Sequence, residues 1–310
     1  MYNIFIDGKE GTTGLQIYDR LSARNDIKLI LLPEELRKDT EARRECLNKA
    51  DISFLCLPDA AAVEAVSLVS NPGARIIDAS TAHRTDPGWV YGLPELSSER
   101  RAAIASSKRV ANPGCYATGF ITLVAPLVNC EVVAPDYPFV CHALSGYSGA
   151  GKKGIAQYEG ADRDLELDSP RHYALGQKHK HIPEMVRECG LLSAPVFSPI
   201  ICDYYAGMCV CVPIHRSLLT KKYGCKAMRE YFAEYYDRQN FIKVMAEEDT
   251  PAYLPANKIV GSNKLEIYVC GNDEQMTLFS VFDNLGKGAS GAAVQNMNIM
   301  LGLDEATSLI

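Results

Sequence analysis

The sequence predicts an α/β protein of two domains: a doubly wound parallel sheet, then an α+β domain on a largely antiparallel or mixed sheet. Over about the first hundred residues, short apolar strand runs alternate with helical segments, which is typical of parallel sheets covered by helices. After about residue 130 the strand runs cluster and few helices separate them. The length of 310 residues agrees with two domains of roughly 150 residues each.

In the first part, each predicted strand is a short β-branched or aromatic run. The expected strands are Tyr2–Asp7, 28–32, 52–57 and 75–79. Two helices are expected between them. The first, at 14–22, places Leu15, Tyr18 and Leu21 on one face, and the second is the segment 60–69, rich in alanine and valine.

In the second part, five strand runs and two helical segments are expected. The strand runs lie at 139–144, 196–200, 208–215, 264–270 and 276–282. The sequence Gly-Asn-Asp-Glu at 271–274 favours a hairpin between the last two. Helices are expected at 226–238 and over the tail at 288–303.

The composition excludes several classes of protein. Lys and Arg number 32 and Asp and Glu 38, so the net charge of −6 argues against a nucleic-acid partner or an anionic membrane surface. No apolar run approaches the roughly 18–20 residues of a membrane span, and no basic segment of a signal peptide precedes the first strand. The eleven cysteines lie mostly in apolar runs without a Cys-x-x-Cys pair, which is usual in a reducing compartment and disfavours zinc. We therefore expect a cytoplasmic protein without a metal site.

A glycine-rich turn follows the first strand and opens the first helix. It has Gly8, Gly11 and Gly14 in a Gly-x-x-Gly-x-x-Gly pattern, with Thr12 and Thr13 between the last two glycines. Glycines let the backbone approach a phosphate, and a helix N-terminus presents free amides to it. Such a pattern often marks only a turn, but the strand–turn–helix context favours dinucleotide binding.

Four charged residues after the second strand bear on which dinucleotide binds. An acidic residue that closes this strand would bind a ribose 2′-hydroxyl and favour NAD. Here Glu34 and Glu35 follow the strand, and Arg37 and Lys38 come next. The basic pair could reach a 2′-phosphate, which favours NADP. All four are also typical of an ordinary solvated start of a helix.

One cysteine and two histidines are candidates for covalent chemistry. Cys115 follows a Pro-Gly turn at the start of a predicted helix, where free amides stabilise a thiolate and lower the pKa of the thiol. A nucleophilic cysteine also needs a proton-transfer partner. His179 and His181 lie in a basic segment, and an extended backbone would place both on one face. The alternatives are a small residue in a tight turn and a solvated basic loop.

Two further segments rich in small residues could approach a ligand closely. The loop 145–151 follows a strand run, and its serines together with Lys152 could donate to an oxyanion or a phosphate. A flexible surface loop is the alternative. The segment 283–293 precedes the last helix and implies close backbone packing or close ligand approach.

Seven motifs carry a resemblance that covers nearly the whole chain. They lie at 6–14, 78–84 (Asp-Ala-Ser-Thr-Ala-His-Arg), 91–96 (Tyr-Gly-Leu-Pro-Glu-Leu), 112–118 (Asn-Pro-Gly-Cys-Tyr-Ala-Thr), 145–151, 181–184 and 283–298. In this order they resemble the short (type 2) form of the N-acetyl-γ-glutamyl-phosphate reductases of arginine biosynthesis, also called N-acetylglutamate-semialdehyde dehydrogenases.

The resemblance implies a fold and an assembly. It implies a Rossmann dinucleotide-binding domain at 1–114, with a C-terminal helix at 286–310 packed back onto it. A catalytic and dimerisation domain of the glyceraldehyde-3-phosphate dehydrogenase-like type would occupy 115–285. It also implies a homo-oligomer, either a dimer or a tetramer.

The resemblance further implies NADPH-dependent reduction of an acyl phosphate to an aldehyde, with release of inorganic phosphate, through a thioester on Cys115. His181 is the expected acid/base, with His179 as its rival. The expected cofactor-binding residues are Gly8, Gly11, Thr12, Thr13, Gly14, Ser145, Gly149, Asn284 and Lys287. The expected substrate-binding residues are Arg84, Ser148, Lys152, Arg171, Lys178 and Glu184.

Several alternatives stay open at this point. A related acyl-phosphate reductase, such as aspartate-semialdehyde dehydrogenase or the aminoadipate enzyme, would use the same cysteine chemistry on a substrate of different length. A Cys-His hydrolase would leave the glycine-rich turn unexplained. A dinucleotide-binding redox sensor without turnover would lose no catalytic rate on replacement of Cys115.

Overall fold

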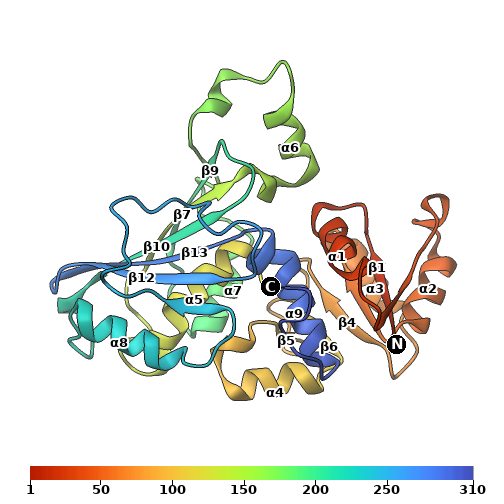
Figure 1. The fold of residues 1–310 in the computed structure, drawn as a ribbon, viewed down its shortest axis with the longest axis horizontal. Coiled ribbons are helices and arrows are strands. Elements are labelled where there is room, and N and C mark those ends of the chain that lie inside the picture. Colours follow the sequence, from red (N-terminus) through yellow and green to blue (C-terminus); the bar gives the residue numbers. More distant parts are fainter. Residues whose placement is uncertain (310) are drawn as a thin grey trace. The chain divides into compact units, whose positions relative to one another are not determined.

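A computed structural model describes residues 1–309 of the chain. It contains two compact units (Figure 1). Unit 1 comprises Met1–Gly114 together with the segment from Ala289 onward, and unit 2 comprises Cys115–Gly288. Within residues 1–309, no helix has both the length and the apolar character needed to cross a lipid bilayer.

Unit 1 is built on a six-stranded parallel sheet, as the sequence predicts, with strand order β2-β1-β3-β4-β6-β5. The chain runs from β1 to β2 on one side and then crosses to β3 on the other, so β1 lies at the topological switch point. The strands are β1 (Tyr2–Asp7), β2 (Ile27–Ile30), β3 (Ile52–Leu55), β4 (Arg75–Asp78), β5 (Val90–Tyr91) and β6 (Arg109–Ala111).

The helices of unit 1 are α1 (Thr12–Ser22), α2 (Thr40–Lys49), α3 (Asp59–Ser67), α4 (Ser98–Ser106) and α9 (Gly291–Met300). The residues Leu15, Tyr18 and Leu21, which the sequence analysis placed on one face of α1, are not buried together. Leu15 is 44% exposed, and the buried residues are Gly14, Ile17 and Leu21. The reason is the glycine-rich turn, because a side chain at Gly14 would lie 2.5 Å from the carbonyl oxygen of Gly8 and this face must therefore meet the turn.

Helix α9 is buried along its whole length, although three of its residues carry amide side chains. Each amide has a partner elsewhere in unit 1. Gln295 donates to Glu95 (2.8 Å), Asn296 donates to the carbonyl oxygen of Gly92 (2.9 Å), and Asn298 accepts from Arg24 (2.7 Å). A π-helical turn at Gly286–Ser290 precedes α9, and the chain passes between the units after Gly288 rather than after residue 285.

Unit 2 is built on a seven-stranded mixed sheet with strand order β11-β12-β13-β10-β7-β9-β8. Strands β7 and β9, and also β11 and β12, pair in parallel, and the other neighbours are antiparallel. The predicted hairpin at 271–274 joins β12 and β13. The strands are β7 (Val140–Gly146), β8 (Arg171–His172), β9 (Val196–Cys202), β10 (Met208–His215), β11 (Ile242–Val244), β12 (Leu265–Gly271) and β13 (Gln275–Phe282).

Helix α5 is the central helix of unit 2 and packs against β10, β13 and a neighbouring helix, α7. Pro126 lies inside α5, and it cannot donate the backbone hydrogen bond that the carbonyl of Thr122 would normally accept. The hydroxyl of Tyr236 donates to this carbonyl instead, at 2.7 Å. The helices of unit 2 are α5 (Cys115–Asn129), α6 (Gly151–Glu159), α7 (Ile182–Cys189) and α8 (Cys225–Tyr235).

Candidate active site

A cavity of about 430 Å³ lies in unit 1 at the carboxyl ends of β1, β2 and β3. Open α/β sheets bind ligands at this edge, beside the switch point. Three segments form most of the wall: 5–11 from β1 and the following turn, 29–32 from β2, and 56–58 after β3. The strand order alone therefore places a binding cavity where the glycine-rich turn lies.

The glycine-rich turn forms part of this wall with its backbone. Gly8 has a positive φ of 85°, and a side chain there would lie 2.3 Å from the carbonyl oxygen of Cys56. Only glycine fits this position without displacing the chain that follows β3. Gly8 and Gly11 line the cavity, whereas Thr12, Thr13 and Gly14 form the first turn of α1 and lie outside its lining.

Basic side chains from the turn after β1 and from the segment after β2 line the cavity. Lys9, Arg37 and Lys38 all belong to the wall. Arg37 pairs with Glu34 at 2.5 Å, and the Lys9 ammonium lies 4.2 Å from the ring centroid of Tyr18. Glu34, the first carboxylate after β2, is therefore paired with a cation.

A buried ion pair that the sequence analysis missed lies behind the turn. Arg43 of α2 donates from Nε and Nη2 to one oxygen of Asp7, at 3.0 Å each, and both side chains are buried. Burial raises the pKa of Asp7, and the hydrogen bond and charge of Arg43 oppose this rise. The partners are 36 positions apart in the sequence, so no local pattern signals the pair.

Cys115 is the first residue of α5 in unit 2, as predicted from the Pro-Gly turn before it, and it is partly exposed. The next residue, Tyr116, is buried within a cluster of rings. Its neighbours are Tyr173, His179, His181 and Phe197, with ring centroids 5.3–6.3 Å from that of Tyr116. The structure therefore brings both predicted histidines to the residue that adjoins the cysteine.

The two histidines meet through a turn of the chain, so the expectation of an extended backbone is wrong. His181 has helical backbone angles and lies immediately before α7, and its backbone N–H donates to Nδ1 of His179 at 3.1 Å. The two rings contact edge to face with centroids 4.6 Å apart. Nε2 of His179 lies 3.3 Å from the hydroxyl of Tyr173.

Both tyrosines of this cluster keep their protons at neutral pH. Burial raises the pKa of Tyr116 well above its usual value, and negative charge on Tyr173 or Cys115 raises it further. Burial also raises the pKa of Tyr173, and negative charge on Cys115 adds to the rise. The two phenols are therefore hydrogen-bond donors beside the cysteine.

The side chain of Asn284, just after β13, forms a hydrogen bond to the loop after β7. Asn284 donates to Oγ of Ser148 at 3.0 Å and accepts from the backbone N–H of Gly207 at 2.7 Å. Ser145 is buried and donates to the carbonyl oxygen of Gly146, and Gly149 is exposed. The predicted cofactor residues Asn284 and Ser145 are therefore engaged within unit 2.

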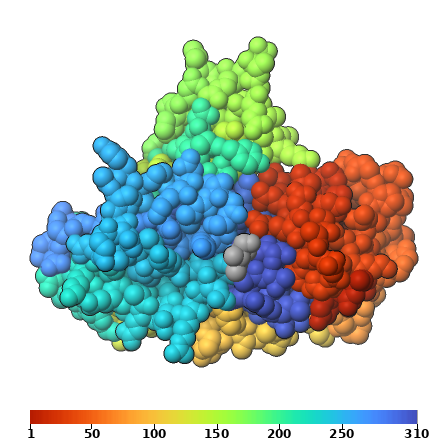
Figure 2. Space-filling view, in the orientation of Figure 1, coloured from red at the N-terminus to blue at the C-terminus, as the bar shows by residue number. Residues whose placement is uncertain are grey.

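The predicted substrate residues of unit 2 differ in how exposed their side chains are. Lys152 and Lys178 are exposed, and Figure 2 shows the green segment that carries α6 at the surface of the unit. Arg171 lies over the ring of Tyr158 and donates to its hydroxyl at 3.0 Å. Glu184 is 1% exposed in the first turn of α7.

The predicted cofactor residue Lys287 is fully buried, in the π-helical turn before α9. Its ammonium lies 5.8 Å from the ring centroid of Phe241. The long side chain therefore runs through the interior and not across the surface.

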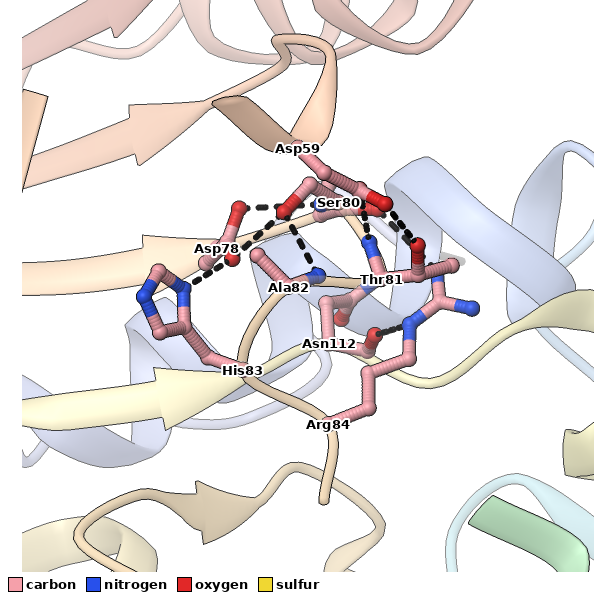
Figure 3. A network of polar contacts seen from close by, with 9 residues as sticks. Asp59, Asp78, Ser80, Thr81, Ala82, His83, Arg84 and Asn112 are labelled. Carbon is pink, nitrogen blue, oxygen red and sulfur yellow. Dashed lines mark hydrogen bonds and ion pairs between the residues drawn. The ribbon is translucent and has the colours of Figure 1, made fainter. Parts of the chain in front are cut away.

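A polar network in unit 1 surrounds the residues after β4 (Figure 3). Asp78 accepts from the backbone and the hydroxyl of Ser80, and its other contact is Nδ1 of His83, at 2.6 Å. The His83 ring stacks on Trp89 with centroids 4.1 Å apart. These contacts explain the motif at 78–84, to which the sequence analysis assigned no structural role.

Arg84 reaches the chain just before the cysteine. Its Nε donates to the carbonyl oxygen of Asn112 and its Nη2 to that of Ala79, both at 3.0 Å (Figure 3). Asn112 stands three positions before Cys115. Arg84, a predicted substrate-binding residue, thus supports the backbone that leads to the cysteine.

Two family descriptions match the chain. Residues 115–284 match "Semialdehyde dehydrogenase, dimerisation domain", and residues 31–104 match "Semialdehyde dehydrogenase, NAD binding domain". Solved structures share the fold. Aspartate semialdehyde dehydrogenase II from Vibrio cholerae has a TM-score of 0.74 at 16% identity and covers 97% of this chain and 99% of its own. The Candida albicans enzyme, solved with NADP, has a TM-score of 0.70 at 14% identity and covers 97% and 98%.

Curated relatives are similar over the whole length. "N-acetyl-gamma-glutamyl-phosphate reductase 2" of Pseudomonas putida is 46% identical and covers 98% of this chain and 98% of its own. The reductase of Burkholderia ambifaria is 45% identical, with 98% and 97% covered. "N-acetyl-gamma-glutamyl-phosphate reductase 2" of a Nostoc species is 43% identical, with 99% and 98% covered. The resemblance and the fold inferred from the sequence motifs are confirmed, and the chain belongs to the N-acetyl-gamma-glutamyl-phosphate reductase family.

Proposed function

We propose that this protein reduces N-acetyl-γ-glutamyl phosphate to N-acetylglutamate semialdehyde and phosphate in arginine biosynthesis, with NADPH as reductant and Cys115 as nucleophile. Identity of 43–46% to the named reductases over about 98% of the chain supports the reaction. The observation that carries the mechanism is the place of Cys115, partly exposed at the first position of a 15-residue helix and next to the histidine cluster.

The cysteine would act in two stages. The Cys115 thiolate, favoured by the free amides at the start of α5, attacks the acyl carbon, and the bond from that carbon to the phosphate oxygen breaks. NADPH, when bound, supplies the hydride that reduces the resulting thioester carbon. The Cys115 sulfur then leaves the reduced carbon, and the semialdehyde is released.

The geometry favours His181 as the proton carrier. Both nitrogens of His179 are engaged within the cluster, since Nδ1 accepts from the backbone of His181 and Nε2 contacts the Tyr173 hydroxyl. His179 would therefore orient its neighbour. His181 would take the proton from the thiol and return it to the Cys115 sulfur, when the oxyanion on the reduced carbon re-forms its carbonyl bond and the sulfur leaves.

The cavity of unit 1 fits the nucleotide. Its volume of about 430 Å³, the side-chain-free wall at Gly8 and Gly11 and the start of α1 suit an adenosine with its pyrophosphate. Arg37 and Lys38 would bind the 2′-phosphate, since they line the cavity after β2. Glu34 is paired with Arg37 and so is poorly placed to accept from a 2′-hydroxyl.

The remaining residues have proposed roles that are less specific. Among the cofactor residues, Thr12, Thr13 and Gly14 would support the pyrophosphate turn from α1, and Ser145, Gly149, Asn284 and Lys287 would form the nicotinamide side. Among the substrate residues, Arg84, Ser148, Lys152, Arg171, Lys178 and Glu184 would hold the phosphate and the carboxylate. Residues 115–284 would form the contact of a homo-oligomer, since they match a dimerisation domain.

The proposed reaction is tested in the reverse direction. Purified protein should reduce NADP⁺ with N-acetylglutamate semialdehyde in the presence of phosphate, and should do so much more slowly with NAD⁺. Aspartate semialdehyde is the control substrate. Preference for it would keep the chemistry but reject the proposed substrate. Cys115→Ser should bind NADPH as the wild type does and lose turnover, and a Cys115→Ser protein that retains turnover would reject the covalent mechanism.

The cofactor preference has its own test. Replacing Arg37 or Lys38 by alanine should raise the KM for NADPH about tenfold to a hundredfold, the effect of one lost charge-assisted hydrogen bond, and leave the KM for NADH nearly unchanged. Lys28→Ala is the matched control, because this lysine is exposed on β2 and lies outside the cavity lining. An equal rise for both cofactors would reject a 2′-phosphate contact.

A further inference from the structure

Gly288 touches the proposed nucleophile. A methyl group built on Gly288 would lie 2.9 Å from Cβ of Cys115, closer than real side chains approach one another. The same methyl group would lie 3.2 Å from the Phe282 ring and 3.3 Å from the carbonyl oxygen of Asp283. The atom that must yield is a Cβ, which is fixed to the backbone of α5 and cannot rotate away. Cys115 can therefore keep its position only because Gly288 has no side chain.

Gly288 is itself held in place on both sides. Its own N–H donates to the carbonyl oxygen of Asp283 at 2.9 Å, in the π-helical turn Gly286–Ser290. The next residue, Ala289, accepts a hydrogen bond from the side chain of Asn112 at 3.0 Å. Asn112 in turn stands only three positions before Cys115. Since its neighbours are fixed, Gly288 cannot retreat from an added side chain.

The π-helical turn is the means by which the backbone comes this close. A π-helical turn adds a residue to the normal helical repeat, and such turns are rare and concentrate at functional sites. Here the turn presents a glycine to Cys115, the first residue of α5. The backbone of the turn thus packs against Cβ of Cys115, the atom that carries the sulfur.

We propose that Gly288 is a positioning residue that fixes the Cys115 side chain for attack, an inference that rests on the proposed role of Cys115 as nucleophile. A displaced Cβ carries the sulfur with it. Catalysis requires the sulfur at its attack position, and a misplacement of about 1 Å can cost about a hundredfold in rate. Substrate and cofactor binding do not require the sulfur at that position. The inferred role therefore predicts a loss in kcat without a matching change in KM.

The test compares Gly288→Ala with two glycine controls in unit 2. Gly288→Ala should lower kcat about tenfold or more and keep both KM values within about twofold. Gly271→Ala should lower thermal stability without lowering kcat, because Gly271 has φ 111° at the hairpin, the opposite end of β13 from Phe282, and a side chain there would lie 2.3 Å from the carbonyl oxygen of Gln275. Gly176→Ala should change neither quantity, since nothing lies within 4 Å of the added methyl group.

A second readout reports the thiol without catalysis. The rate at which iodoacetamide modifies Cys115, followed by peptide mass spectrometry, should change at least threefold in Gly288→Ala and stay at the wild-type value in both controls. Wild-type kcat and wild-type alkylation in folded Gly288→Ala would overturn the inference. Turnover that survives in Cys115→Ser would instead reject the proposed function. The two failures are therefore distinguishable.

One variant covers the case in which Gly288→Ala does not fold. Asn112→Ala removes the hydrogen bond to Ala289 and leaves no steric clash. It should lower kcat several-fold with KM unchanged and should alter the alkylation rate of Cys115 in parallel. A KM effect alone would contradict positioning.

Discussion

The hydroxyl of Tyr236 takes over a hydrogen bond that Pro126 cannot make, and removing it should destabilise unit 2. The carbonyl of Thr122 is buried, and the Tyr236 hydroxyl, itself on a buried side chain, donates to it at 2.7 Å. A buried acceptor that loses its donor costs about 1–3 kcal/mol. Unit 2 has roughly 170 residues, for which each kcal/mol lowers the melting temperature by about 2–4 °C. We therefore expect Tyr236→Phe to lower the unit 2 transition by about 2–12 °C.

Calorimetric unfolding of the wild type, of Tyr236→Phe, of Pro126→Ala and of the double variant tests this reasoning. Pro126→Ala restores a backbone N–H that can donate to Thr122, so Tyr236→Phe should cost nearly nothing in that background, with a coupling free energy of about 1–3 kcal/mol. Tyr231→Phe is the matched control. Its hydroxyl also donates to an α5 carbonyl, that of Pro126 (2.6 Å), but this oxygen keeps a second donor, the N–H of Cys130. An equal cost of Tyr236→Phe in both backgrounds would refute the argument.

Three further predictions follow from the described geometry. His181→Asn should lower kcat by about a hundredfold or more and His179→Asn by less, as seen in pH profiles of kcat/KM, and the reverse order would exchange their roles. Burial raises the pKa of Cys211 to about 11, so its alkylation by iodoacetamide should increase about tenfold per pH unit between pH 7 and 10, and a plateau below pH 9 would contradict this. Gly92→Ala should lower the stability of unit 1 by about 1–3 kcal/mol in thermal unfolding, because the added methyl group would lie 2.4 Å from Nδ2 of Asn296. Combining it with Asn296→Ser, which shortens that side chain, should recover part of the lost stability.

Strands with a clear apolar alternation were predictable from the sequence. The strand Met208–His215 has the predicted bounds because its even-numbered residues are buried and most of its odd-numbered ones are less so. The two-residue strand Val90–Tyr91 and the three-residue strand Arg109–Ala111 were missed, since so short a run shows no period. Helix α2 was missed because its composition is mostly polar.

Local signals located the cysteine, but long-range pairing could not be read from the sequence. The Pro-Gly turn before an apolar run predicted that a helix begins at Cys115. By contrast, Asn284 meets Ser148 across 136 positions, and only the fold brings them together. The same holds for the approach of Gly288 to Cys115, which depends on how a π-helical turn packs against the start of α5.

Unit 1 is made of two separate stretches of the chain, and this sets the order in which the two units can be completed during synthesis. Helix α9 belongs to the interior of this unit, yet it is translated after all of unit 2. At about 5–20 residues per second, the roughly 170 intervening residues take about 9–35 s to make. For that time Gly92, Glu95 and Arg24 lack the amide partners that α9 later provides. Unit 2 is contiguous and can reach its final packing first, so the nucleotide-binding unit, although made first, is the second to be completed.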